Sequence, residues 1–180
     1  MLSDTAPVKT DKGHAPLRTQ RLTLHPLTPA EAERIVNGTP GAGDRWGRGY
    51  PSDGDVAGAS GYLRVRADHG DPGVFGAYEI RRREDGEAVG GIGFHGPPDD
   101  ERFVTVGYGL TEAVQGQGYA REALAELIRV AGEAGAAGVE GDADLGNVAS
   151  QRVMEAVGML LVREDEQLRH YRLVFPAGGA

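Results

Sequence analysis

The residues best suited to chemistry in this sequence form a glycine-containing turn, Gln115-Gly116-Gln117-Gly118-Tyr119-Ala120. A β-type run over 103–110 precedes the turn, and a strongly amphipathic helical pattern follows it. Glycines at a strand-to-helix turn leave backbone N–H groups unobstructed at a helix N-terminus, where the helix dipole also favours negative charge. The segment therefore predicts a site for a phosphate group, although a small-residue turn without a ligand would have the same composition.

The spacing of this turn excludes two common nucleotide sites. A dinucleotide loop needs a glycine three residues after Gly118, where this chain has Arg121. A nucleotide-triphosphate loop needs Gly-Lys-Ser/Thr, which does not occur in the chain. The pattern Gln/Arg-x-x-Gly-x-Gly/Ala does fit, with Gln115, Gly118 and Ala120 in its defined positions. In this respect the turn resembles the acyl-CoA pyrophosphate loop of the GNAT N-acetyltransferase superfamily.

A second segment, Asn147 to Met159, resembles another motif of that superfamily, Asn-x-x-Ser/Ala…Glu-x-x-Gly-Phe, with Met159 in the place of Phe. Two motifs in the correct order are far more specific than either one alone. The pairs Gly107-Tyr108 and Glu122-Ala123 make the likeness greatest to the branch of ribosomal-protein alanine N-acetyltransferases.

The elements that would position these motifs follow from periodicity and turn residues. Thr28-Pro29 is typical of a helix start, Asp85-Gly86 of a hairpin turn, and Gly158 of a helix C-cap. The order β-α-α-β-β-β-α-β-α-β-β predicts an α+β domain with a largely antiparallel sheet, and it is also the order of the GNAT fold. The expected strands cover 17–27, 74–81, 88–94, 103–110, 139–143, 160–163 and 168–175, and the expected helices cover 30–36, 61–67, 120–134 and 148–157.

The resemblance implies a mixed, mostly antiparallel sheet of about seven strands flanked by helices. Its fourth and fifth strands would separate around acetyl-CoA. Backbone near Leu110 would then hold the pantetheine and face the thioester oxygen, and Asn147 would contact the pantetheine. An exposed helix position for Arg121 and an N-cap role for Asn147 fit the sequence equally well. The residues implied to cradle the pyrophosphate are Gln115, Gly116, Gln117, Gly118, Tyr119, Ala120 and Arg121.

The resemblance also suggests catalytic groups. Ser150 occupies the position of a serine that protonates the departing thiolate in the ribosomal branch, whereas relatives with a Tyr acid carry it where this chain has Met154. His95 ends a strand and is a candidate general base, and Glu112 and Glu164 are alternatives. Trp46 and Tyr50 lie in the loop where the family builds its acceptor pocket, although buried packing would explain them too.

Composition narrows the class of protein. A chain of 180 residues suits one domain, predicted over 15–176, with tails at 1–14 and 177–180. It has no cysteine and no long apolar run, which favours a cytoplasmic protein without disulfides, membrane spans or metal. The net charge of −8 disfavours nucleic-acid binding. A homodimer stays open.

These observations lead to one main hypothesis and two alternatives. The main hypothesis is transfer of an acetyl group from acetyl-CoA to a primary amine, on a peptide N-terminus or a small molecule. A catalytically idle acyl-CoA-binding or regulatory domain is the alternative that the missing Tyr acid and unassigned base leave open. A hydrolase is disfavoured, because Tyr62 replaces the second glycine of a nucleophile elbow at Gly58-Ala59-Ser60-Gly61.

Overall fold

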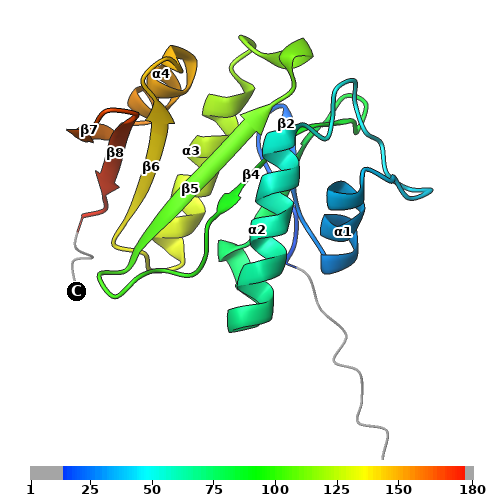
Figure 1. The fold of residues 1–180 in the computed structure, drawn as a ribbon, viewed down its shortest axis with the longest axis horizontal. Coiled ribbons are helices and arrows are strands. Elements are labelled where there is room, and N and C mark those ends of the chain that lie inside the picture. Colours follow the sequence, from blue (N-terminus) through cyan, green and yellow to red (C-terminus); the bar gives the residue numbers. More distant parts are fainter. Residues whose placement is uncertain (1–13, 177–180) are drawn as a thin grey trace, which may run out of the picture.

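The structure is a computed structural model that describes residues 14–176. These residues build one β-sheet with helices packed on both faces (Figure 1). The predicted tails lie outside the described residues, apart from His14. In chain order the elements are β1 (Leu17–Arg18), β2 (Leu22–Pro26), α1 (Pro29–Asn37), α2 (Asp53–His69), η1 (Gly73–Phe75), β3 (Ala77–Arg82), β4 (Ala88–Phe94), β5 (Phe103–Leu110), η2 (Glu112–Val114), α3 (Tyr119–Glu133), β6 (Gly138–Asp144), α4 (Val148–Ala156), β7 (Leu160–Glu164) and β8 (Leu168–Val174).

The strands within the described residues form one sheet in the order β1-β2-β3-β4-β5-β6-β8-β7. Every neighbouring pair is antiparallel except β5 and β6, so the predicted mixed, largely antiparallel sheet is confirmed. The sheet has 8 strands instead of the expected seven or so, because the strand expected over 17–27 is interrupted. The chain turns at Thr19, whose N–H and hydroxyl both donate to the Leu22 carbonyl, at 3.0 and 3.3 Å.

The two faces of the sheet are covered differently. On one face, α3 and α4 bury the main apolar core, which includes Leu24, Ile80 and Val104 from strands and Leu124 and Leu127 from α3. On the other face, α1 and α2 lie over the half of the sheet that contains β2 to β5 (Figure 1). A smaller apolar cluster of Leu27, Ala32, Ile35, Tyr50, Ala59, Tyr62 and Ala88 fills this second contact. No helix within residues 14–176 is long and apolar enough to cross a membrane.

Helices α1 and α2 begin with the same local structure. The Thr28 side chain accepts from the Glu31 N–H, and the Glu31 carboxylate accepts from the Thr28 N–H at 2.8 Å. Ser52 and Asp55 repeat this reciprocal arrangement at the start of α2, also at 2.8 Å. Both are capping boxes, which satisfy N–H groups that a helix start leaves without partners. The helix start predicted at Thr28-Pro29 is confirmed.

The sequence prediction was least accurate for α2. The expected helix covered 61–67, whereas α2 runs from Asp53 to His69. Glycines at 54, 58 and 61 each weaken helix formation by about 1 kcal/mol and obscure the pattern. The Ser52 cap and the burial of Tyr62 against the sheet compensate for them. Ser60 lies inside this helix and donates to the Val56 carbonyl at 2.8 Å, so no nucleophile elbow forms there.

Other boundaries differ by a few residues. The strand expected from Val74 begins at Ala77, because Gly73–Phe75 forms a short 3-10 helix. The C-cap of α4 is Val157, one residue before the predicted Gly158, and Gly158 follows it with a φ of +90°.

Candidate active site

The predicted phosphate loop connects β5 to the N-terminus of α3. Gly116 and Gly118 have φ values of +76° and +82°, which glycine adopts without strain. Gly118 is the N-cap of α3 and supplies no side-chain cap, so the first N–H groups, from Tyr119 to Arg121, have no partner within the helix. A Cβ on Gly116 would meet no atom within 4 Å, so open space lies beside the loop. These features fit the pyrophosphate of an acyl-CoA.

Residues from the beginning of the chain fix this loop. The Arg21 guanidinium donates to the Gln117 carbonyl at 2.8 Å and to the Glu122 carboxylate at 2.7 Å. Glu122 also accepts from the Thr19 hydroxyl, at 2.6 Å, and Arg21 lies over the ring of the buried Tyr119. Burial alone would raise the pKa of Glu122, but the hydrogen bonds from Thr19 and Arg21 outweigh burial and lower it. The sequence carries no local signal for Arg21, because its role depends on the packing of β2 beside α3.

Strands β5 and β6 separate toward the end of the sheet that lies nearest the glycine loop, as the resemblance implied. Their register joins Phe103–Thr105 to Gly138–Glu140 only, whereas β5 continues to Leu110 and β6 continues to Asp144. The other edge of β5 stays paired with β4 as far as Leu110. A gap therefore opens beside residues 106–110 and leads toward the glycine loop.

Alternation along β5 decides which backbone groups face this gap. The Thr105 carbonyl accepts from the N–H of His95, which directly follows β4, and the Thr111 N–H donates to the Val89 carbonyl of β4, each at 2.9 Å. Such bonds fall on every second residue of an antiparallel strand. The intervening residues that face the gap are Val106, Tyr108 and Leu110. The carbonyl of Leu110 accepts from the Gln115 side chain at 3.1 Å. The Leu110 N–H faces the gap by the same alternation.

The start of α4 borders the same gap. The hydroxyls of Tyr108 and Ser150 are 2.8 Å apart, and Tyr108 also donates to the Ser150 carbonyl at 3.1 Å. Burial raises the pKa of Tyr108, against the effect of its bond to Ser150. Asn147 caps α4 through Oδ1, which accepts the Ser150 N–H at 3.1 Å, and its exposed amide group can still donate. Met154 is buried, which accounts for an apolar residue where relatives place a Tyr.

A cavity of about 440 Å³ lies between α2 and the sheet, and β5 separates it from the strand gap. Its floor is a rectangle of glycines, because Gly91 pairs with Gly109 and Gly93 pairs with Gly107. Paired residues point to the same face of a sheet, so none of the four glycines places a side chain there. A Cβ on Gly109 would meet no atom within 4 Å, whereas other residues lie close over the remaining three glycines. Backbone without side chains lets a ligand approach the strands closely.

Two titratable side chains lie over this floor. A Cβ on Gly91 would be 2.8 Å from Oδ1 of Asp55, and a Cβ on Gly107 would be 2.7 Å from Nε2 of His95. Burial raises the pKa of Asp55, although hydrogen bonds from Ser52 oppose that shift. The structure thus brings His95 to the cavity, and its role as a base stays a prediction. Asp55 was missed at the sequence level, although the Ser52-x-x-Asp55 spacing was a usable capping signal.

The other predicted acceptor and base residues are distributed unevenly. Tyr50 lines the cavity, whereas Trp46 packs edge-on against Tyr50, with ring centroids 5.8 Å apart, and does not line it. Glu164 pairs with Arg169 at 2.6 Å on β7 and β8, and Glu112 is exposed beside the glycine loop. Neither glutamate borders the cavity.

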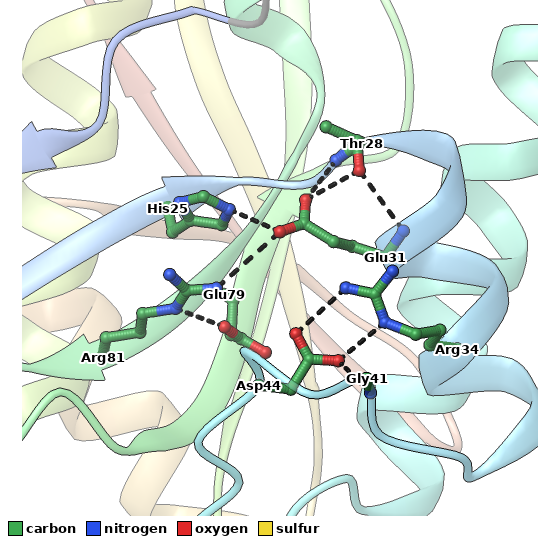
Figure 2. A network of polar contacts seen from close by, with 8 residues as sticks. All are labelled: His25, Thr28, Glu31, Arg34, Gly41, Asp44, Glu79 and Arg81. Atoms are coloured by element: carbon green, nitrogen blue, oxygen red, sulfur yellow. Dashed lines mark hydrogen bonds and ion pairs between the residues drawn. The ribbon is translucent and has the colours of Figure 1, made fainter.

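Beside the cavity, paired charges join α1 to the sheet (Figure 2). The Glu31 carboxylate accepts from His25 Nε2 and from the Thr28 N–H and hydroxyl, all at 2.8 Å, and lies 3.9 Å from the Arg81 guanidinium. Burial would raise the pKa of Glu31, but the hydrogen bonds from His25 and Thr28 lower it to about 2. The hydrogen bonds of this carboxylate therefore attach α1 to the sheet.

Comparison with known protein families gives a match over residues 21–160 to the acetyltransferase (GNAT) domain. The matched segment contains the glycine loop, the strand gap, the cavity and the second motif. It covers well over half of the chain, so it applies to the domain as a whole.

Individual proteins are similar to the chain over different shares of its length. The chain is 26% identical over 98 residues to an uncharacterized N-acetyltransferase, YjdG, of Bacillus subtilis (strain 168), a match that spans 54% of this chain and 58% of that relative. The crystal structure of an acetyltransferase from Agrobacterium tumefaciens strain C58 superposes with a TM-score of 0.64 and 28% identity, covering 93% of this chain and 99% of the other. A ribosomal L7/L12 alpha-N-protein acetyltransferase in complex with coenzyme A shares the fold, with a TM-score of 0.63, 15% identity, and coverage of 87% and 95%.

Proposed function

We propose that this chain, which belongs to the GNAT acetyltransferase family, transfers an acetyl group from acetyl-CoA to a primary amine. The observation that carries the proposal is the double role of β5. One edge of this strand faces the gap that leads to the glycine loop, and one face of it forms part of the cavity floor beneath α2. A donor that lies along one edge of β5 and an acceptor that lies over one face of it would therefore bind beside the same strand, which brings their reacting ends close together, as group transfer requires.

On the donor side, the chain offers groups for each part of acetyl-CoA, which when bound supplies an acyl thioester. The amides of Gly116, Gly118, Tyr119 and Ala120 would bind the pyrophosphate, with Arg21 and Arg121 as nearby cations. The Leu110 N–H would hold the pantetheine and stabilise charge that develops on the thioester oxygen. Asn147 would donate its free amide hydrogens to the pantetheine.

The departing sulfur needs a proton, and the Tyr108–Ser150 pair can supply it. The 2.8 Å contact orients the Ser150 hydroxyl at the end of the gap, and Tyr108 can replace the proton that Ser150 gives up. This arrangement supports the predicted role of Ser150 as general acid. It also makes the absence of a Tyr at Met154 compatible with turnover.

The test is acetyl transfer by the 180-residue chain. The protein is incubated with acetyl-CoA and a panel of amines (tetrapeptides with free N-terminal Ala, Ser or Met, tyramine, spermidine and an aminoglycoside), and both thiol release and product mass are measured. We expect at least one amine to gain an acetyl group. Tight binding of coenzyme A with no acetylated product on the whole panel would instead favour the idle acyl-CoA-binding domain.

A pair of variants tests the donor site independently of the acceptor. Gly118→Asp places an anion against the proposed pyrophosphate and should weaken coenzyme A binding at least about tenfold by calorimetry. Gly135→Asp is the matched control, because Gly135 has the same left-handed backbone, a φ of +87°, at the other end of α3. Equal coenzyme A affinity in the two variants would contradict the donor site.

A further inference from the structure

The cavity contains a buried carboxylate, that of Asp55, of which only one oxygen accepts hydrogen bonds from the described residues. Asp55 is 7% exposed, and its Oδ2 accepts from the N–H and the hydroxyl of Ser52, at 2.8 and 2.7 Å. Its other oxygen, Oδ1, accepts no hydrogen bond from a described residue and lies directly over Gly91. Among residues 14–176, the only side-chain polar atom that is both fully enclosed and unpaired is Nε of Arg82, so Oδ1 keeps access to the cavity.

No cation within the described residues neutralises Asp55, although its neighbours are paired. Glu79, the other buried carboxylate on this face, forms an ion pair with Arg81. A buried charge without a partner is costly, and a cationic ligand would remove that cost. The titratable and charged groups that face Asp55 or line the cavity with it are Tyr50, Tyr62, Arg64, Tyr78, Glu79, His95 and Tyr108.

The pairing of the glycines places Oδ1 of Asp55 one strand away from β5, the strand that borders the proposed donor gap. Gly91 and Gly109 are paired neighbours, so one strand spacing of about 5 Å separates them. The space over Gly109 is open, so a nitrogen bonded to Oδ1 has room to lie on that side, toward the strand whose far edge faces the gap. Because neither glycine carries a side chain, only backbone lies beneath that nitrogen, and a slender chain end can lie flat against it.

We propose that Asp55 binds the protonated amine of the acceptor and removes its proton before the attack on the thioester. The substrate class is a primary ammonium at the end of an unbranched chain. This inference rests on the proposed acetyl transfer and adds the acceptor's recognition group to it.

The protons balance through the two ends of the site. The ammonium gives one proton to Oδ1, and the neutral nitrogen forms the C–N bond while the C–S bond breaks. Ser150 protonates the sulfur, and the second nitrogen proton passes to water as the amide forms. Tyr108 passes its hydroxyl proton to Ser150 and takes up the proton that went to water, and Asp55 releases its proton to solvent when the product leaves, so each turnover releases one proton.

Turnover tests the proposal first. With the best acceptor of the panel, Asp55→Asn should lower kcat/KM for the amine about 100-fold and leave KM for acetyl-CoA unchanged. The acid limb of the kcat/KM profile against pH should disappear as well. Asp53→Asn is the matched control, because Asp53 is exposed in the same first turn of α2 and does not line the cavity. Rates for Asp55→Asn within about twofold of Asp53→Asn would overturn the proposal.

Binding tests it without any turnover. Butylammonium chloride is added to the isotope-labelled chain without acetyl-CoA, and backbone amide resonances are followed by NMR, with butanol as the uncharged control. We expect butylammonium, but not butanol, to shift the Asp55 and Gly91 resonances, and Asp55→Asn to remove the shift. Absence of the shift in the wild-type chain would overturn the proposal even if amines are acetylated. Conversely, the shift without acetylation would leave Asp55 as a cation site and reject the transferase function alone.

Discussion

Helices α1 and α2 both start with a capping box, but the carboxylates of the two boxes have different surroundings. Each has a hydroxyl residue as N-cap and a carboxylate three residues later, and both helices cover the same face of the sheet. Glu31 is surrounded by donors from His25, Thr28 and Arg81, and the pKa of this carboxyl falls to about 2 (Figure 2). Asp55 has Ser52 alone, and burial raises its pKa. The number of partners, and not the capping motif, therefore decides whether the carboxylate stabilises the fold or stays available to a ligand.

This difference places stability and function in separate helices. A carboxylate whose charge is fully paired contributes to folding, whereas an unpaired buried carboxylate costs folding energy and is retained where a ligand uses it. The α1 side of the face is closed by ion pairs such as Arg34–Asp44, at 2.6 Å, and the α2 side opens into the cavity.

The largest effect on stability is expected for Glu31→Gln. The pKa of Glu31 is lowered from 4.5 to about 2, which corresponds to about 3.4 kcal/mol without screening and to roughly 2–3 kcal/mol of stability at pH 7 once solvent screening of this half-buried group is included. Denaturant unfolding of the two proteins at pH 7 measures this difference. A loss below about 0.5 kcal/mol would show that the contacts in Figure 2 do not hold α1.

The same variant gives a signed dependence on pH. Because the folded-state pKa is depressed, the stabilisation by Glu31 is complete above pH 4.5 and is lost as the pH falls toward 2. The unfolding curves of wild type and Glu31→Gln should therefore converge in that window. A constant gap down to pH 2 would mean that the ionised form of Glu31 is not what the fold stabilises.

A smaller effect is expected when the caps themselves are removed. Thr28→Ala and Ser52→Ala should each lower stability by about 1 kcal/mol, because each leaves a helix N–H group without its partner. Only Ser52→Ala should also change the acid limb of turnover, since the bond from the Ser52 hydroxyl lowers the pKa of Asp55 and its loss raises that pKa further, while the bond from the backbone N–H remains. Thermal unfolding and a pH profile of kcat/KM, run on both variants, separate the shared effect from the distinct one.

The smallest change in stability is expected for Asp55→Asn. An amide can still accept from Ser52, and the charge it replaces has no cation within the described residues, so the free energy of unfolding at pH 7 should stay within about 0.5 kcal/mol of wild type. A raised pKa stabilises the fold at low pH and loses that contribution as the pH rises through the folded-state value. The variant should therefore gain relative to wild type between acid and neutral pH. A large loss at pH 7 would assign Asp55 to the fold, as for Glu31.

The local parts of this structure could be predicted from the sequence. The α1 start at Thr28, the strand 103–110 and the glycine loop follow from capping, alternation and turn residues, and the two motifs were enough to indicate the family. The strands 88–94 and 103–110 also contain the alternating glycines of the cavity floor, but their pairing depends on the register of β4 and β5.

The non-local parts could not be predicted in this way. The sequence did not predict residues 53–60 of α2, because the glycines there weaken the helical pattern. The N-cap of α2 and its contacts with the sheet stabilise the helix in the fold. Arg21 and Tyr108 act on residues far away in the chain, Gln117 and Ser150, so no local spacing indicates them. Asp55 stands out because no cation within the described residues pairs with it. Which charges lie near a residue depends on the fold, so the sequence alone could not show this.

The most direct test is a carboxyl-carbon NMR titration of Asp55 and Glu31 in one sample, with and without butylammonium chloride. We expect the pKa of Asp55 to lie above its ordinary value of 3.8 and to fall when the cation is present, because a bound cation favours the carboxylate. Glu31 should titrate near pH 2 in both conditions. A pKa of Asp55 that is unchanged by butylammonium, or that lies below 3.8 without it, would contradict the assignment of this carboxylate to the acceptor amine.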